Sequence, residues 1–287
     1  MSTDGEATAS QDGGGTPEDE EVLASFRETV EEGTVRLGRT LSGLLATGFI
    51  GGVEVGLGVL ALLVVEHLTH SPLLAGLAFS VGFIALTLGR SELFTENFLV
   101  PVATVVAHRA SVWSLLRLWA GTGASNLAGG WIIAAVIVMA LPEAGATAVE
   151  LAAEYNGLGL GLESFGLGIL GGAVITVMTW MERGSDSEFG KVVSAVVAAF
   201  LLGAGSLNHV IVVSLLFFAA LAAGAPFGYL DWLGFAAWAT LANMTGGLLL
   251  VTVMRLVQVG VREVGEQRQR PGGVGANRDA QRAGTGG

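Results

Sequence analysis

The sequence predicts an all-α polytopic membrane protein with six transmembrane spans in an inverted three-plus-three repeat. Hydrophobic residues make up 52% of the chain, charged residues only 14%, and the mean hydropathy is +0.65. Two apolar stretches, 72–107 and 191–223, each carry a polar break near the middle. A continuous helix over either would be about 50 Å long, whereas the hydrocarbon core of a bilayer is about 30 Å thick. We therefore predict that the second and fifth spans are broken at the midplane, where unwound backbone must line a cavity.

The two ends of the chain are polar. Residues 1–21 are rich in acidic and small residues, which predicts a disordered tail rather than the basic leader of a secretory signal. Residues 22–38 place Phe26 and Val30 at helical spacing among acidic side chains, which predicts an amphipathic helix on the bilayer surface. Residues 259–287 are rich in Gly, Gln and Arg and are expected to form a second disordered tail.

Six apolar segments lie between these tails. The first three-span repeat is expected at 39–142 and the second at 164–258, joined by an extracellular-side loop at 143–163. Because three is an odd number, the second repeat enters the membrane in the opposite sense to the first. The individual spans are expected at 40–65, 72–107, 118–141, 164–181, 191–223 and 232–254.

Short motifs support the repeat. The pair Gly51-Gly52 of the first span recurs as Gly171-Gly172 in the fourth, 120 residues later. Asn126 of the third span recurs as Asn243 of the sixth, 117 residues later, and each is followed three residues on by two glycines. The two polar breaks correspond at nearly the same offset, so three separate features agree on one internal repeat.

The basic residues predict the orientation. The loops at 66–72, 142–163 and 222–231 contain no Lys or Arg, whereas the other basic residues fall on the opposite side of a six-span chain. Only Arg90, inside the first break, does not follow this rule. The positive-inside rule then predicts a multi-pass protein of the plasma (inner) membrane with both termini in the cytoplasm.

The breaks place polar groups in mid-membrane. Half-helices that start near Asn97 and Val210 would both direct their N-terminal N–H groups to the midplane, where an anion or a carbonyl-like oxygen is favoured. The alternative for the polar residues of the breaks is a plain helix-capping role. That alternative applies to Thr95 or Asn97 in the first break and to Ser206 or Asn208 in the second.

His209 is the strongest candidate for function. An ionisable side chain at mid-membrane is costly unless it has a partner or faces a cavity, and imidazole changes charge near neutral pH. The alternative is a neutral histidine hydrogen-bonded inside the helix bundle. No metal-ligand spacing occurs, so we expect no metal. The apolar composition makes a soluble enzyme unexpected, and we expect no enzymatic activity, no other cofactor and no nucleic-acid partner.

Two motifs carry a family resemblance. Glu92-Leu93-Phe94-Thr95 followed by Asn97, together with Asn208-His209 in the fifth span, is similar to the pattern of the formate/nitrite transporter family over about 39–258. The resemblance implies an aquaporin-like fold, a homopentamer in the lipid bilayer with one pore per subunit, and passage of small monovalent anions or their weak acids. Known members carry formate, nitrite, hydrosulfide, acetate or lactate.

The resemblance also implies roles for single residues. Thr95 would be the break threonine that hydrogen-bonds the central histidine, His209. Leu93 and Phe83 would form an apolar constriction on one side, and Leu202 would form a constriction on the other. The full set of expected pore or substrate residues is His209, Thr95, Leu93, Phe94, Phe83, Leu202, Asn208, Arg90, Glu92 and Glu96.

Several residues depart from the family pattern and indicate a divergent subgroup. Arg90 and Glu96 replace small residues, Val210 and Val213 replace polar ones, and Gly172 stands where Asn is frequent. Arg90 either attracts anions to the pore or forms an ion pair with Glu92 or Glu96, because an unpaired charge at this depth is costly.

The mechanism that these residues predict begins with an anion drawn to the breaks. The anion takes a proton near His209 and crosses the apolar constrictions as a neutral acid, since a bare charge cannot pass them cheaply. Three alternatives stay open: a water or neutral-solute channel, although no Asn-Pro-Ala motif occurs; an ion-coupled carrier; and a scaffold or sensor without transport.

Overall fold

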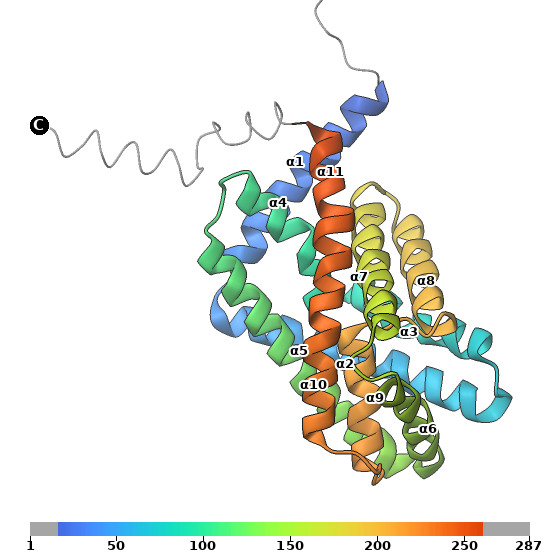
Figure 1. Cartoon of the computed structure of the whole chain (residues 1–287). Helices are drawn as coiled ribbons and strands as arrows, with labels where there is room; N and C mark the ends of the chain where they lie inside the picture. The colour runs from blue at the N-terminus through green and yellow to red at the C-terminus, as the bar shows by residue number, and fades with distance from the viewer. Residues whose placement is uncertain (1–16, 261–287) are drawn as a thin grey trace, which may run out of the picture.

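Long apolar helices dominate the structure, a computed structural model that describes residues 17–260 (Figure 1). Within that part of the chain, five helices are long and apolar enough to cross a membrane, α10 continuing through η2 into α11 as one rod. The elements are α1 (Pro17–Leu37), α2 (Leu41–Thr69), α3 (Pro72–Gly89), η1 (Phe94–Phe98), α4 (Val100–Val106), α5 (Val112–Ala140), α6 (Pro142–Leu158), α7 (Leu162–Arg183), α8 (Glu188–Ala204), α9 (Val210–Ala222), α10 (Tyr229–Met244), η2 (Thr245–Thr252) and α11 (Val253–Val259).

The two long apolar stretches are each divided into shorter helices. In the first, α3 ends at Gly89, an extended segment leads to the 3-10 turn η1, and α4 follows. In the second, α8 ends at Ala204 and α9 begins at Val210. Arg90 and Ser206 take left-handed backbone angles, with φ of 55° and 46°, one residue or two after the preceding helix ends. A left-handed residue there satisfies the last carbonyls of a helix and turns the chain away.

Helix α9 lies at the centre of the molecule. All its residues from Val210 to Ala220 are buried, and α5 and α6 pack against it. The connection 143–163, expected to be a loop, is mostly the helix α6. The expectation is wrong because Ala144, Ala148 and Ala152 form a buried stripe of small residues, which lets α6 pack closely on the core.

Helix α1 packs its apolar face on the rest of the protein. Its apolar residues Phe26 and Val30 are buried against Ala103 and Ala107 at and just after α4, and against Val259 of α11. The amphipathic helix expected at 22–38 is present, and the apolar side chains expected to face lipid face protein instead. The helix also begins at Pro17, inside the tail expected at 1–21. Figure 1 shows α1, α4 and α11 at one end of the molecule and α6 at the other; the remaining parts of the two expected tails, 1–16 and 261–287, lie outside the described residues.

Candidate functional site

His209 and Thr95 meet inside the bundle, between the two interrupted stretches. Both side chains are fully buried, and His209 Nε2 lies 2.6 Å from Thr95 Oγ1. Thr95 stands in η1, and His209 is the residue that directly precedes α9. The hydrogen bond that the family resemblance implies is present, and it joins positions 114 residues apart in the chain.

The backbone around His209 determines which ring nitrogen carries the proton. His209 is the N-cap of α9, and its Nδ1 accepts a hydrogen bond of 3.3 Å from the Val212 N–H. A neutral imidazole has one donor and one acceptor nitrogen, so Nε2 carries the hydrogen and donates it to Thr95. A hydrogen on Nδ1 would leave the Val212 N–H without its acceptor. The local structure therefore favours a neutral His209.

These capping contacts differ from two predictions made from the sequence. Helix α9 is capped by His209 itself, and neither Ser206 nor Asn208 serves as its N-cap. The Val210 N–H, expected to be free for an anion, donates to Asn243 Oδ1 at 2.9 Å. In the first break, no side chain caps η1 or α4. Thr95 and Asn97 are thus not plain capping residues.

The first break is fastened by one asparagine of α5. Asn126 Nδ2 donates to the carbonyls of Gly48 and Glu92, at 2.7 and 2.8 Å. Its Oδ1 accepts the Phe94 N–H at 2.8 Å. Asn126 is fully buried. Two of its bonds satisfy backbone groups of Glu92 and Phe94 that the extended segment leaves without helical partners, and the third ties the break to Gly48 of α2.

The second break is fastened in the same way. Asn243 Nδ2 donates to the carbonyls of Gly168 and Asn208, at 2.8 and 2.7 Å, and its Oδ1 accepts the Val210 N–H. The two asparagines bond equivalent positions in their own halves of the chain. Asn208, expected to line the pore, is instead held by Asn243 and by Ser164, whose carbonyl accepts from its Nδ2 at 3.3 Å.

Glycines allow the helices to approach this closely. A Cβ on Gly52 would overlap the Asn126 carbonyl, and one on Gly172 would overlap the Asn243 carbonyl. The repeated glycines of the sequence are therefore the sites where α2 crosses α5 and where α7 crosses the helix carrying Asn243. Gly172, noted as a departure from the family pattern, has no space for a larger side chain.

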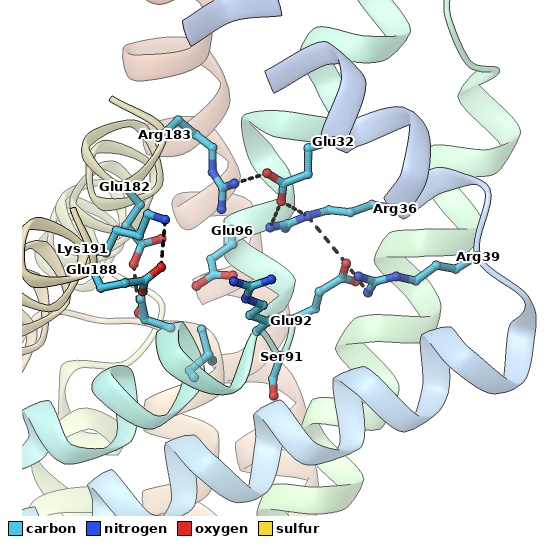
Figure 2. A pocket seen from close by; sticks show the side chains of 13 residues that line it. Glu32, Arg36, Arg39, Ser91, Glu92, Glu96, Glu182, Arg183, Glu188 and Lys191 are labelled. Carbon is cyan, nitrogen blue, oxygen red and sulfur yellow. Dashed lines mark hydrogen bonds and ion pairs between the residues drawn. The ribbon is translucent and has the colours of Figure 1, made fainter. Parts of the chain in front are cut away.

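A polar cavity of about 370 Å³ lies beside η1, at the end of the molecule where α1 packs. Figure 2 shows acidic and basic side chains from α1, the first break, α7 and α8 facing one another around it. We call it the polar cavity. It is lined by Glu32, Arg36, Arg39, Leu86, Thr87, Arg90, Ser91, Glu92, Glu96, Glu182, Arg183, Glu188 and Lys191.

Arg36 organises the ion pairs of the polar cavity. It lies 2.6 Å from Glu32, 3.6 Å from Glu92 and 3.2 Å from Asn97 Oδ1, so it links α1 to the first break. Arg39 also pairs with Glu92, at 2.5 Å, and Arg183 of α7 pairs with Glu32. Figure 2 shows this chain of charges running from Arg183 to Arg39.

The ion pairs act on the ionisation of Glu32. Burial alone would raise the pKa of this carboxyl, but Arg36 and Arg183 beside it outweigh that effect and hold the pKa below its ordinary value. Glu32 therefore stays ionised near neutral pH, and its charge contributes to the attachment of α1 to α7.

Arg90 does not pair with Glu92 or Glu96, so that interpretation of the sequence is wrong. Glu92 is taken by Arg36 and Arg39, while the exposed Arg90 side chain makes no ion pair with any residue of 17–260. The physical reason is the left-handed turn at Arg90, which leaves its side chain on the exposed wall of the polar cavity. Arg36 of α1 provides the charge compensation instead.

The three expected constriction residues lie in one buried cluster, whereas Phe94 also borders a hollow of its own. Phe83, Leu93 and Leu202 belong to one buried apolar cluster, and Leu202 also lines a smaller cavity of about 120 Å³ beside α6. Phe94 lines neither this cavity nor the polar one. It borders a separate apolar hollow with Trp119 and Ile211.

Sequence reasoning missed three residues of this site. Glu32 and Glu182 were not singled out, and Arg36 was not recognised as a partner of the first break. The available signal was Glu182 with Arg183, a charged pair at the end of an apolar span, together with the i, i+4 spacing of Glu32 and Arg36.

Comparison with known proteins gives the family. The family model described as Formate/nitrite transporter matches residues 23–257, which is most of the chain. The chain belongs to the formate/nitrite transporter family. The fold, the matched region and the long apolar helices together make it a membrane protein of a transporter family.

Individual relatives are distant. The chain is 26% identical to inner membrane protein YfdC of Escherichia coli over 83% of its own length and 79% of the relative's. It is 30% identical to formate channel FocA of Haemophilus influenzae, but over 48% of its length and 50% of the relative's. It is 24% identical to an uncharacterized transporter, YrhG, of Bacillus subtilis over 79% and 89% of the two chains.

Solved structures share the fold of this formate/nitrite transporter family member. One, an FNT family ion channel, aligns with a TM-score of 0.72 at 16% identity, over 80% of this chain and 97% of the other. A pentameric formate channel with formate bound aligns with a TM-score of 0.61 at 20% identity, over 75% and 95%. At these identities the likeness establishes the helical fold and leaves the substrate open.

Proposed function

We propose that this protein is a transmembrane channel for small monovalent anions that cross as their weak acids, with Thr95 and His209 at the central barrier. The observation that carries the proposal is the buried 2.6 Å contact between these two side chains, between the two interrupted stretches of a formate/nitrite transporter family member. Formate, nitrite and acetate are substrates of the expected size and charge.

Paired contacts in the two halves of the chain support an internal repeat. We interpret the paired bonds of Asn126 and Asn243, and the paired close approaches at Gly52 and Gly172, as an inverted three-plus-three repeat of six spans. In this interpretation the second and fifth spans are broken at the midplane, and both termini face the cytoplasm. The polar cavity then opens on the cytoplasmic side.

The surroundings of His209 favour passage of the neutral acid. Leu93 and Leu202 are buried in one apolar cluster, and an ion would lose its hydration there with little compensation. The Thr95 hydroxyl accepts from His209, so its own hydrogen is free to donate to an anion. We propose that this donor holds the anion at the barrier while a proton arrives.

We also propose that five copies of this chain assemble into a homopentamer. One structural neighbour is a pentameric formate channel, and exposed apolar residues cover α2, α3, α5 and α10 in this chain. An isolated subunit would present these faces to lipid, and five copies would bury part of them.

The test is solute flux in proteoliposomes that contain the full chain. Formate, nitrite and acetate should each enter faster than into protein-free liposomes, and an inward proton gradient should accelerate them. Flux of water or glycerol without any anion flux would contradict the proposal and favour a neutral-solute channel. Uptake that requires a sodium gradient would favour an ion-coupled carrier instead.

A further inference from the structure

The polar cavity contains two buried carboxyl groups that the ion pairs do not neutralise. Glu96 and Glu182 are 4% and 7% exposed, and neither forms a salt bridge with another residue of 17–260. Glu182 accepts a hydrogen bond of 2.9 Å from Thr87. The Oε1 atom of Glu96 has no hydrogen-bond partner within the described chain.

The two carboxyl groups share one cavity. Glu96 from η1 and Glu182 from α7 both line the polar cavity, so two buried carboxylates would face the same enclosed space. Figure 2 shows the Glu96 side chain extending from η1 into the cavity. Two carboxylates that share one buried site cannot both remain ionised at low cost, and the usual outcome is a single proton held by the pair.

The other charged groups around Glu96 and Glu182 do not neutralise the two carboxylates. Arg36 of α1 and Arg183 of α7 act on both carboxyls, but both are already engaged by Glu32. Glu32 adds a further negative charge near Glu182. The remaining charged groups that line the cavity are Arg39 and Glu92, which pair together, Lys191 and Glu188, which pair together, and the exposed Arg90.

We propose that Glu96 and Glu182 form a proton-binding site that holds one exchangeable proton in the polar cavity and passes it toward the anion at Thr95. Glu96 is the neighbour of Thr95 in η1, so one short helical turn carries a proton site on its cavity side and the anion donor on its His209 side. The neutral tautomer of His209, fixed by Val212, leaves the imidazole without a spare proton to give.

The transfer of the proton is balanced at each step. A proton from the solvent in the cavity binds one carboxylate of the pair and forms a carboxylic acid. That acid transfers the proton to the anion, which becomes the neutral acid, and the pair returns to two carboxylates until the next proton binds. The pair can bind a proton whether or not the protein transports anions. The role of the pair as proton donor, however, rests on the proposed transport function.

Infrared spectroscopy of the purified full chain tests proton binding directly. Wild-type protein should show a protonated carboxyl band at neutral pH that disappears in alkaline solution. Glu96, whose Oε1 has no hydrogen-bond partner in the part of the chain that the structure describes, should carry the proton, whereas Glu182 accepts from Thr87. Glu96→Gln should therefore abolish the band, and Glu182→Gln should move its disappearance to lower pH, because the repelling charge is gone. Glu163→Gln, at the exposed opposite end of α7, is the matched control and should leave the band unchanged.

The outcomes separate this inference from the proposed function. Absence of the band in wild-type protein, or its persistence in Glu96→Gln, overturns the proton site whatever the flux results are. The wild-type titration remains decisive if a variant fails to fold. In proteoliposomes that transport an anion, Glu96→Gln should lower acid-driven flux several-fold and flatten its pH dependence; unaltered flux and pH dependence would overturn the donor role while leaving transport itself established.

Discussion

At the scale of single residues, the contact between Thr95 and His209 is the most informative feature. It is a buried donor and acceptor pair, so removing one partner leaves the other without a hydrogen bond. The family resemblance suggested this pair from two short motifs. The tautomer of His209 could not be predicted, because it depends on α9 starting at Val210 and on the direction of the Val212 N–H.

Replacing Thr95 by Val tests this contact. The Nε2–H of His209 would then lack an acceptor, which should cost about 1–3 kcal/mol of stability. We expect a lower melting temperature and a loss of anion flux. Thr240→Val is the control, since that hydroxyl bonds only Ala236 of its own helix. Equal effects of the two substitutions would argue against a special role for Thr95.

Glu32 provides a prediction about pH. Its folded-state pKa lies below the ordinary value, so its charge stabilises the folded protein at neutral pH, and this contribution is lost as the pH falls through the acidic range. Glu32→Gln should therefore lower the melting temperature at neutral pH, and the difference from wild type should shrink in acid. A difference that grows in acid would mean that the pKa of Glu32 is not lowered in the folded protein.

At the scale of elements, the sequence predicted the long helices well and their partners less well. Mean hydropathy and length locate α2, α3, α5 and α7, since a bilayer demands about 20 apolar residues. The amphipathic pattern of α1 does not distinguish a lipid surface from a protein surface, and in this chain α1 packs on the protein. Helix α6 was missed because its small, evenly mixed residues resemble a loop.

The glycine crossings make a prediction at this scale. Gly172→Ala should force α7 away from the helix that carries Asn243, because the new Cβ would overlap the Asn243 carbonyl. We expect a destabilisation of at least about 1–3 kcal/mol, measured by thermal unfolding in detergent. Gly166→Ala, in the same helix with no atom near the new Cβ, should be tolerated. Equal stability of both variants and wild type would show that α7 and the helix carrying Asn243 can separate without cost.

At the scale of the whole molecule, two matched asparagines explain why two distant motifs form one site. Asn126 and Asn243 each hold one break, and the breaks bring Thr95 and His209 together. The glycine and asparagine spacing that marks these positions was visible in the sequence. The polar cavity was not, because its charges come from α1, the first break, α7 and α8, which no sequence period connects.

The assembly can be measured directly. Native mass spectrometry of the detergent-solubilised full chain should give a mass of five subunits, because the exposed apolar faces of the long helices are available for association. A stable monomer in mild detergent would contradict the homopentamer.

The central claim is that an anion crosses as a neutral acid at a barrier controlled by His209. Formate uptake into proteoliposomes under an inward proton gradient tests it most directly, with wild type beside His209→Asn. We predict rapid, acid-stimulated uptake in wild type and a strongly altered rate and pH dependence in the variant. No acid-driven uptake of any small anion by wild type, or identical uptake by the variant, would contradict this claim.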